Sequence, residues 1–326
     1  MSLKSWMSDL PEELLDIPVM CLAIPGSHDS MSFTIKRGAK LAPDCMPILN
    51  HLNPFFGPIV RRLSYNWCIT QHATTSVQLL NGIRYFDLRI SKRKDPHGYY
   101  FVHSSYGAQI NEELYHINEF LQDFPHEIVI LDFQHIYNFE DVDHVQLINF
   151  LHSVFSTKIC TFPDNLTLVT LNWMRSQGYQ VIIIYRAIGM TNNRNFWPFG
   201  RWHTPWPNTT STKFLLEILS NGIDNRVPRE GLVSQCVLTP DVKYIVANFY
   251  STLKKSCVQR CNRAVIPWIL EQNINGKDYL GINVVIADFI GEENCAFSQS
   301  VISLNYKYVG KVLEYKRCSS PTRHSA

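Results

Sequence analysis

The sequence predicts an α/β fold built on a parallel sheet, either a closed barrel or an open doubly wound sheet. Continuous apolar runs such as those over 128–133, 181–185 and 282–289 are typical of strands that helices cover on both faces. Helical periodicity lies between these runs, and polar side chains follow several of them. Alternation of strands and helices over 326 residues is the pattern of either α/β architecture.

The predicted elements follow one another along one large unit. Strands are expected over residues 20–24, 83–90, 99–103, 128–133, 180–185, 231–237 and 282–289. Helices are expected over residues 111–124, 141–155, 212–219 and 264–272. We expect a single domain over residues 1–310 and a flexible tail over residues 311–326, because no shift in composition divides the chain.

The composition is that of a globular protein with near-balanced charge. Charged residues make up 18% of the chain and hydrophobic ones 45%, and the formal net charge is +2, which argues against disorder and against a dedicated nucleic-acid binder. The first residues carry acids where a secretory signal needs an apolar stretch, so a cytoplasmic protein is expected. The cysteines lack metal-site spacing, so no zinc is expected.

Polar residues at the predicted strand ends form the candidate site. His28 and Asp29 follow the first strand, Asp87 and Arg89 share one face of the second, and His103 ends the third. In a parallel barrel these ends converge on one mouth. Each residue alone is a weak signal, but two histidines, two carboxylates and an arginine together supply a base, an acid and a cation for phosphoryl transfer.

Five motifs give these residues a family context. They are PGSHDS (25–30), GIRYFDLR (82–89), FVHSSYG (101–107), EIVILDFQH (127–135) and IADFIG (286–291). With this spacing the chain resembles the X region of phosphatidylinositol-specific phospholipases C over residues 6–306, and most of all the small eukaryotic proteins that contain an X domain and little else. The resemblance implies a distorted, incompletely closed TIM-type barrel and a phosphoric diester hydrolase acting on phosphatidylinositol-type phospholipids.

The resemblance also assigns roles to the site residues. It makes His28 the general base for the inositol 2-hydroxyl and His103 the general acid for the glycerol oxygen, so that a cyclic inositol phosphate forms. It places Arg89 where the large eukaryotic enzymes hold a calcium ligand, which implies a metal-independent reaction without a cofactor. Asp288 is expected to orient His28, and Asp29 to assist His103 or Arg89.

Further residues are expected to contact the substrate or the membrane. Candidates for the head group are Asp87, Gln134, His135, Tyr185 and Arg186. Candidates for the membrane, in two segments where aromatic residues are flanked by cations, are Phe55, Phe56, Trp202 and Trp206. The expected partners are therefore a phospholipid and a peripheral membrane surface, with no nucleic acid and no obligate protein partner.

Two other functions remain open on the sequence alone. One is a phosphodiesterase for another lipid head group on the same barrel. The other is a catalytically weak or inactive module that binds phosphoinositides, for which the arginine would be needed but not both histidines.

Overall fold

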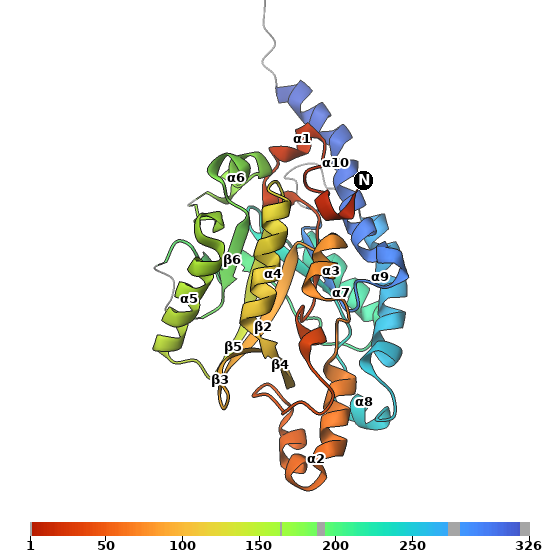
Figure 1. The fold of residues 1–326 in the computed structure, drawn as a ribbon. Helices are drawn as coiled ribbons and strands as arrows, with labels where there is room; N and C mark the ends of the chain where they lie inside the picture. Colours follow the sequence, from red (N-terminus) through yellow and green to blue (C-terminus); the bar gives the residue numbers. More distant parts are fainter. Residues whose placement is uncertain (1, 164, 188–192, 273–280, 320–326) are drawn as a thin grey trace, which may run out of the picture.

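The chain folds into a barrel of parallel strands surrounded by helices (Figure 1). The structure is a computed structural model that describes residues 2–163, 165–187, 193–272 and 281–319, with 308–319 as backbone. Its strands are β1 (Ile24–Ser27), β2 (Tyr85–Lys94), β3 (His97–His103), β4 (Ser105–Gln109), β5 (Val129–Tyr137), β6 (Val181–Tyr185), β7 (Trp197–Pro198), β8 (Trp202–His203), β9 (Gly231–Cys236) and β10 (Val284–Ala287). Its α-helices are α1 (Glu12–Leu15), α2 (Pro47–Cys68), α3 (Thr75–Leu80), α4 (Ile110–Asp123), α5 (Asp141–Phe155), α6 (Leu171–Gln177), α7 (Thr212–Asp224), α8 (Val242–Ala247), α9 (Gln259–Glu271) and α10 (Ala296–Ser319).

Eight of the strands form a nearly closed ring in the order β7-β6-β5-β2-β1-β10-β9-β8. Every neighbouring pair in this order is parallel. The ring has its seam between β7 and β8, which pair with β6 and β9 but, within the described residues, not with each other. The sheet is therefore an incompletely closed barrel rather than an open doubly wound sheet.

The strand that carries His103 does not belong to the ring. β3 runs antiparallel to the outer half of β2, with Ile90 opposite Phe101 and Lys94 opposite His97. The hairpin extends beyond the barrel and then returns His103 to the mouth. The sequence-based expectation that His103 ends a parallel strand was wrong, although its expected position at the mouth is correct.

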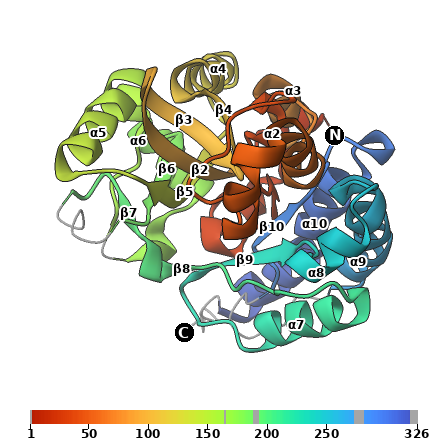
Figure 2. The same cartoon turned by 90° about the horizontal axis from the view of Figure 1, so that it is seen from below.

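Two hydrophobic clusters hold the barrel together. The inner one joins inward-facing strand residues such as Tyr85 and Ile130 to the N-terminal segment through Trp6 and Leu14. The outer one packs the other strand faces against the surrounding helices, which Figure 2 shows around the strands. Alternation along each strand thus gives every second residue to the interior, and this decides which polar side chains reach the mouth.

The predicted elements agree with the structure in most places, but the strand expected over residues 20–24 was wrong, because Val19–Cys21 form a 3₁₀ helix and β1 begins only at Ile24. Helix α5 has the expected bounds, and α4 differs from the expected range by one residue at each end. Helix α2 was missed because Pro54 and Pro58 lie inside it, and its backbone is non-helical at Phe56. Helix α10 continues to Ser319, so part of the expected tail is helical, while residues 320–326 lie outside the described residues.

Candidate active site

The first two site residues come from neighbouring strands of the ring. His28 follows β1 and Asp288 follows β10, and these strands pair residue by residue from Ile24 and Val284. The carboxylate Oδ1 of Asp288 lies 2.7 Å from Nδ1 of His28. An ionised carboxylate only accepts hydrogen bonds, so it fixes the proton on Nδ1 and leaves Nε2 of His28 facing the mouth.

The backbone turns sharply at the residue that directly follows each of His28, His103 and Asp288. Asp29 after His28, Ser104 after His103 and Phe289 after Asp288 all have positive φ angles, of 40°, 55° and 50°. Non-glycine residues rarely adopt this conformation, and it concentrates at functional sites. The turns direct the side chains into the mouth.

Arg89 and Asp29 connect the two histidines. The Arg89 Nη2 atom lies 3.1 Å from His28 Nε2, and Arg89 Nε lies 2.7 Å from Asp29 Oδ1. The other oxygen of Asp29, Oδ2, lies 3.3 Å from His28 Nε2 and 3.1 Å from His103 Nε2. The contacts of Asp29 with these side chains are close but not aligned as hydrogen bonds. One carboxylate thus holds two imidazoles and a guanidinium around a single position.

His103 is fixed from its other side by the end of α2. Its Nδ1 lies 2.6 Å from the carbonyl oxygen of Cys68, which can only accept a hydrogen bond, so Nδ1 carries a proton. Its ring is T-shaped to that of His28, with centroids 6.2 Å apart. Both Nε2 atoms therefore face the same space from different sides.

Burial and charge shift the acid–base properties of these groups in different directions. Burial alone lowers the pKa of His28, but the carboxylates of Asp29 and Asp288 outweigh it, so the pKa of His28 is raised. Burial and the charge of Arg89 lower the pKa of His103 to about 4. Burial raises the pKa of Asp29 to about 6, although Arg89 opposes it. These groups contact one another, so they titrate as a set.

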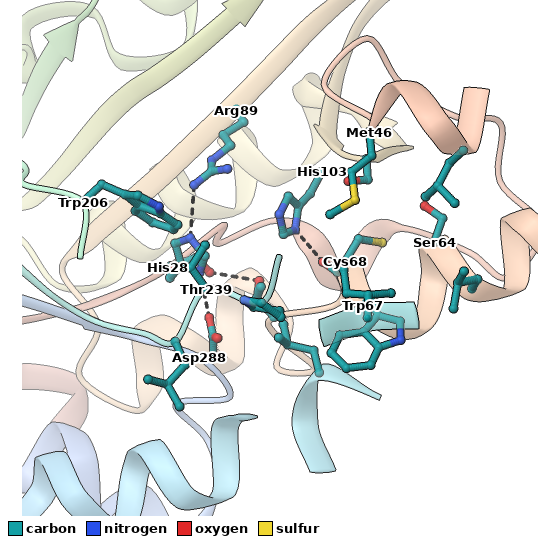
Figure 3. Close-up of a pocket in the computed structure, with 18 residues that line it drawn as sticks. His28, Met46, Ser64, Trp67, Cys68, Arg89, His103, Trp206, Thr239 and Asp288 are labelled. Carbon is teal, nitrogen blue, oxygen red and sulfur yellow. Dashed lines mark hydrogen bonds and ion pairs between the residues drawn. The ribbon is translucent and has the colours of Figure 1, made fainter. Parts of the chain in front are cut away.

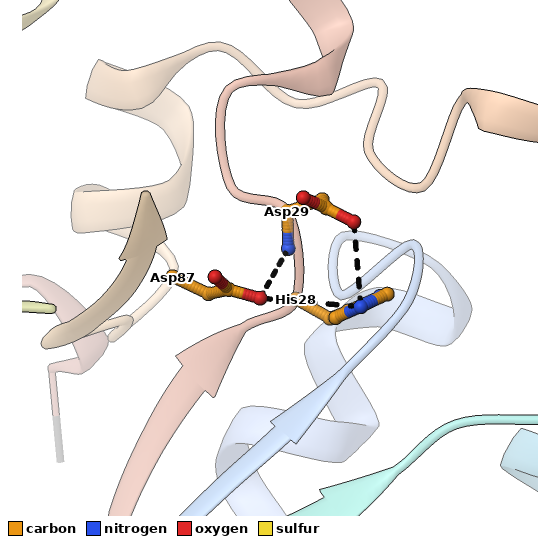
Figure 4. A group of neighbouring side chains, drawn as sticks. All are labelled: His28, Asp29 and Asp87. Atoms are coloured by element: carbon orange, nitrogen blue, oxygen red, sulfur yellow. Dashed lines mark hydrogen bonds and ion pairs between the residues drawn. The ribbon is translucent and has the colours of Figure 1, made fainter. Parts of the chain in front are cut away.

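His28, Asp29 and Asp87 also form the kind of cluster that can hold a cation (Figure 4). Asp87 Oδ2 lies 3.9 Å from His28 Nε2 and accepts the backbone N–H of Asp29 at 3.1 Å. Arg89 competes for the same oxygens, since its Nη2 lies 3.5 Å from Asp87 Oδ2. A guanidinium among the ligands repels a metal ion and neutralises the carboxylates that would attract it.

A pocket of about 170 Å³ opens at this site (Figure 3). His28, Arg89, His103 and Asp288 line its polar end. Its remaining lining is mostly apolar and comes from α2, from the segment after β9, and from α8. The catalytic candidates therefore lie at one end of an apolar space.

Gln134 and Arg186 point into the barrel, beside the predicted catalytic residues. Arg186 forms a two-pronged ion pair with Asp132, with distances of 2.8 and 2.7 Å. The Tyr85 hydroxyl donates to the same carboxylate at 2.6 Å, and Gln134 donates to that hydroxyl at 3.1 Å. In the strand register Asp132 is the partner of Asp87, so this network adjoins the site. Head-group contact by Gln134, Arg186 and Asp87 stays a prediction.

The other two head-group candidates, Tyr185 and His135, do not join this inward-facing network. The expectation that Tyr185 lies at the mouth was wrong. On β6 the side chain of Ile184 points into the barrel, so the side chain of the next residue, Tyr185, points outward. It packs in the outer cluster, and its hydroxyl lies 2.7 Å from His144 Nδ1 in α5. His135 is the register partner of Arg89, but its side chain is exposed and its ring stacks on that of Tyr137.

Of the four membrane candidates, one is buried and three are exposed. Trp202 is only 1% exposed and belongs to the inner cluster, so its expected membrane contact was wrong. Its ring occupies the space in which a Cβ on Gly231 would lie, 2.3 Å away. Phe55 and Phe56 are exposed on α2, and Trp206 is half exposed at the mouth, with its ring centroid 5.6 Å from that of His28. No described helix is long and apolar enough to cross a bilayer.

The structure adds residues that sequence reasoning missed. Asp44 accepts the backbone N–H of Ser104 at 2.8 Å, and its charge raises the pKa of neighbouring His103 against the effect of burial. Gln71 donates to the carbonyl groups of His28 and Ala287 at 3.0 and 2.9 Å and so joins the ends of β1 and β10. No signal marked either residue, because both lie between predicted elements.

Comparisons with known proteins agree with this architecture. No family model matches the sequence. The human PI-PLC X domain-containing protein 3 is 36% identical over 313 residues, covering 94% of this chain and 95% of the relative. The zebrafish (Danio rerio) PI-PLC X domain-containing protein 1 is 31% identical, covering 93% of this chain and 96% of the relative.

Solved structures match the fold at lower identity. The phosphatidylinositol-specific phospholipase C from Listeria monocytogenes superimposes with a TM-score of 0.62 at 18% identity, covering 93% of this chain and 99% of that one. A mutant of the Staphylococcus aureus phosphatidylinositol-specific phospholipase C does so with a TM-score of 0.62 at 15% identity, covering 92% and 96%. The TIM-type barrel inferred from the sequence is thus confirmed. Because more than nine tenths of its length is similar to these curated relatives at 31–36% identity, the chain belongs to the PI-PLC X domain-containing protein family.

Proposed function

We propose that the protein is a phosphoric diester hydrolase that cleaves phosphatidylinositol-type phospholipids by a two-histidine phospholipase C reaction. One observation carries the proposal. A single oxygen atom of Asp29 lies within 3.3 Å of Nε2 in both His28 and His103, while Arg89 contacts the same carboxylate. An arrangement in which two imidazoles and a guanidinium meet around one oxyanion supports binding of a phosphodiester, whose oxygens can accept charge-assisted hydrogen bonds from these groups.

In the first step the inositol 2-hydroxyl attacks the phosphorus. Nε2 of His28 takes the hydroxyl proton, and the imidazolium that forms is stabilised by Asp288 on Nδ1. Arg89 moves its hydrogen bond from His28 to the non-bridging oxygens, whose charge it balances. His103 gives a proton to the glycerol oxygen as the phosphorus–oxygen bond breaks. The products are diacylglycerol and a cyclic inositol phosphate, which water opens with the two histidines in exchanged roles.

The protonation of His103 depends on the bound phosphate. With its pKa lowered to about 4 by burial and by Arg89, His103 is neutral in the free site near neutral pH. A phosphodiester brings a negative charge that offsets the charge of Arg89, and this raises the pKa of His103. Asp29, whose pKa burial raises to about 6, lies beside Nε2 of His103 and can exchange a proton with it. Substrate binding thereby favours the acid form that the leaving oxygen needs.

In this reaction Arg89 supplies the positive charge, so calcium independence is part of the proposal. The ion pairs of Arg89 with Asp29 and Asp87 support it, because the guanidinium neutralises two of the three groups that could ligate a cation. The exposed Phe55 and Phe56 support a peripheral approach to a lipid surface. The proposed location of the protein is the cytoplasm.

The test is hydrolysis of a panel of phosphodiester lipids by the wild type, His28→Ala and His103→Ala. The proposal predicts turnover of phosphatidylinositol by the wild type, a loss of about 10²–10⁴-fold in each variant, and the same wild-type rate with chelator. Equal background rates for all three proteins would instead favour a phosphoinositide-binding module. Turnover of a lipid without inositol would favour the other head-group reading.

A further inference from the structure

The pocket at the active site has an apolar lobe that the two-histidine reaction does not itself require. We define the apolar lobe by six lining residues, Leu49, Leu63, Trp67, Leu238, Ile245 and Leu253. Trp67 immediately precedes Cys68, whose carbonyl group holds His103, so the lobe begins directly behind the imidazole. Figure 3 shows Trp67 and Met46 on the side of His103 opposite to Arg89 and Trp206.

We propose that the apolar lobe binds a hydrocarbon chain of the leaving group, in the segment next to the scissile phosphate. The inference rests on the proposed function, in which His103 protonates the departing oxygen. The group attached to that oxygen must leave past His103, and the surface it meets there consists of aliphatic and aromatic side chains. A sugar head group has little apolar surface to pack against those side chains, whereas an acyl or alkyl chain packs against them and removes their apolar surface from water.

The size of the pocket limits the occupant to part of one chain. The whole pocket, polar end included, has a volume of about 170 Å³, close to the roughly 150 Å³ of an engineered apolar cavity that holds one benzene molecule, so this volume is an upper bound for the apolar lobe. The lobe therefore accommodates at most about six carbon atoms, and two parallel chains do not fit. The rest of a long chain would extend along the exposed apolar side chains of α2, where Phe55 and Ile59 lie.

One polar atom at the entrance of the lobe favours an ester. The Oγ1 atom of Thr239 is buried and has no hydrogen-bond partner among the described residues. Thr239 lines the same pocket as His28 and His103. A buried hydroxyl donor without a partner is costly, and an ester carbonyl near the first carbon atoms of an acylglycerol would accept its hydrogen bond.

The experiment uses soluble inositol phosphodiesters with methyl, butyl, hexyl and octyl leaving groups, below the concentration at which they form micelles. Without an interface, any effect of chain length comes from the protein. Burial of one methylene group (~0.8 kcal/mol) corresponds to an increase of about fourfold in kcat/KM. We expect kcat/KM to rise by about this factor for each added methylene group up to about six carbons, and to stay constant between the hexyl and octyl esters.

Variants of one helix separate the lobe from general effects. Leu63 is a partly exposed lining residue, so Leu63→Trp should shorten the chain length at which the plateau begins and Leu63→Ala should lengthen it. The matched control is Leu52→Trp on the same helix, outside the pocket lining, which should retain the wild-type dependence. Circular dichroism establishes whether each variant is folded. If Leu63→Trp does not fold, the chain-length dependence of Leu63→Ala tests the lobe on its own.

The outcomes for the lobe and for the proposed function are distinguishable. Hydrolysis of all esters with no dependence on chain length would overturn the lobe and leave the proposed function intact. Absence of hydrolysis would overturn the proposed function, and the lobe would then be judged by the affinity of the esters, measured through tryptophan fluorescence. Affinity that does not rise with chain length in that measurement would overturn the lobe as well.

Discussion

Replacement of His103 by alanine tests the assignment of acid and base, because the two histidines have different tasks. The leaving glycerol oxygen is an alkoxide unless it receives a proton, and His103 donates to the carbonyl group of Cys68, the residue after Trp67 of the apolar lobe in which we place the leaving group. A nitrophenolate leaves without a proton. The His103→Ala variant should therefore be severely impaired with an alkyl leaving group and little impaired with a nitrophenyl one.

The expected magnitude follows from general acid catalysis. A positioned acid contributes about 10²–10⁴-fold to the rate, and His103 is well positioned, with Nδ1 fixed 2.6 Å from the Cys68 carbonyl oxygen and Nε2 3.1 Å from Asp29. We expect a loss of that size in kcat/KM for the octyl ester and a loss below about tenfold for the nitrophenyl ester. His28→Ala removes the base, so it should lose about 10²–10⁴-fold with both substrates.

The assay compares the two variants with the wild type on inositol octyl phosphate and inositol nitrophenyl phosphate at one pH. Release of nitrophenolate is followed by absorbance, and the cyclic phosphate from the octyl ester by phosphorus NMR. Equal losses with the two substrates in His103→Ala would refute the role of His103 as the acid. A loss confined to the octyl ester in His28→Ala would mean that the roles are reversed.

Three further outcomes follow from the site and the surface. Arg89→Ala should lower kcat by about 10²–10³-fold, as removal of one oxyanion donor does, and wild-type rates should not change with chelator in the same assay. In the free enzyme the base His28 has a pKa above the ordinary histidine value and the acid His103 one of about 4, so the form with His28 neutral and His103 protonated is a minor one, and kcat/KM should follow a bell between these two values. Asp288→Asn should move the upper limit of the bell to lower pH, because Asp288 raises the pKa of His28. Phe55→Ser with Phe56→Ser should weaken partitioning onto phospholipid vesicles by more than tenfold in a sedimentation assay, given ~1.5–3 kcal/mol for each buried side chain, and an unchanged partition would contradict this surface.

Much of the fold could be read from the sequence because buried parallel strands carry a strong signal. The apolar runs that contain Val129 and Val181 gave ring strands, and the polar residues after them lie at or near the mouth. The short strands β7 and β8 were hidden in a segment rich in tryptophan and proline, since two residues are too few to show a period. Their position at the seam explains why Trp202 is buried.

The candidate site could be predicted as a set but not in its details. His28, Arg89 and His103 are marked by motifs, and the structure brings them around Asp29. The direction of Tyr185 could not be foreseen, because in a continuous apolar run no polar alternation shows which face points inward. Sequence spacing likewise could not show that β3 reverses and delivers His103 from outside the ring.

The most direct test of the account is the product that wild-type protein forms from phosphatidylinositol in the presence of excess chelator. If Arg89 and the two histidines perform the reaction, phosphorus NMR should show the cyclic inositol phosphate accumulating, at the rate seen without chelator. No cyclic product, or a product formed only after calcium is restored, would contradict the account.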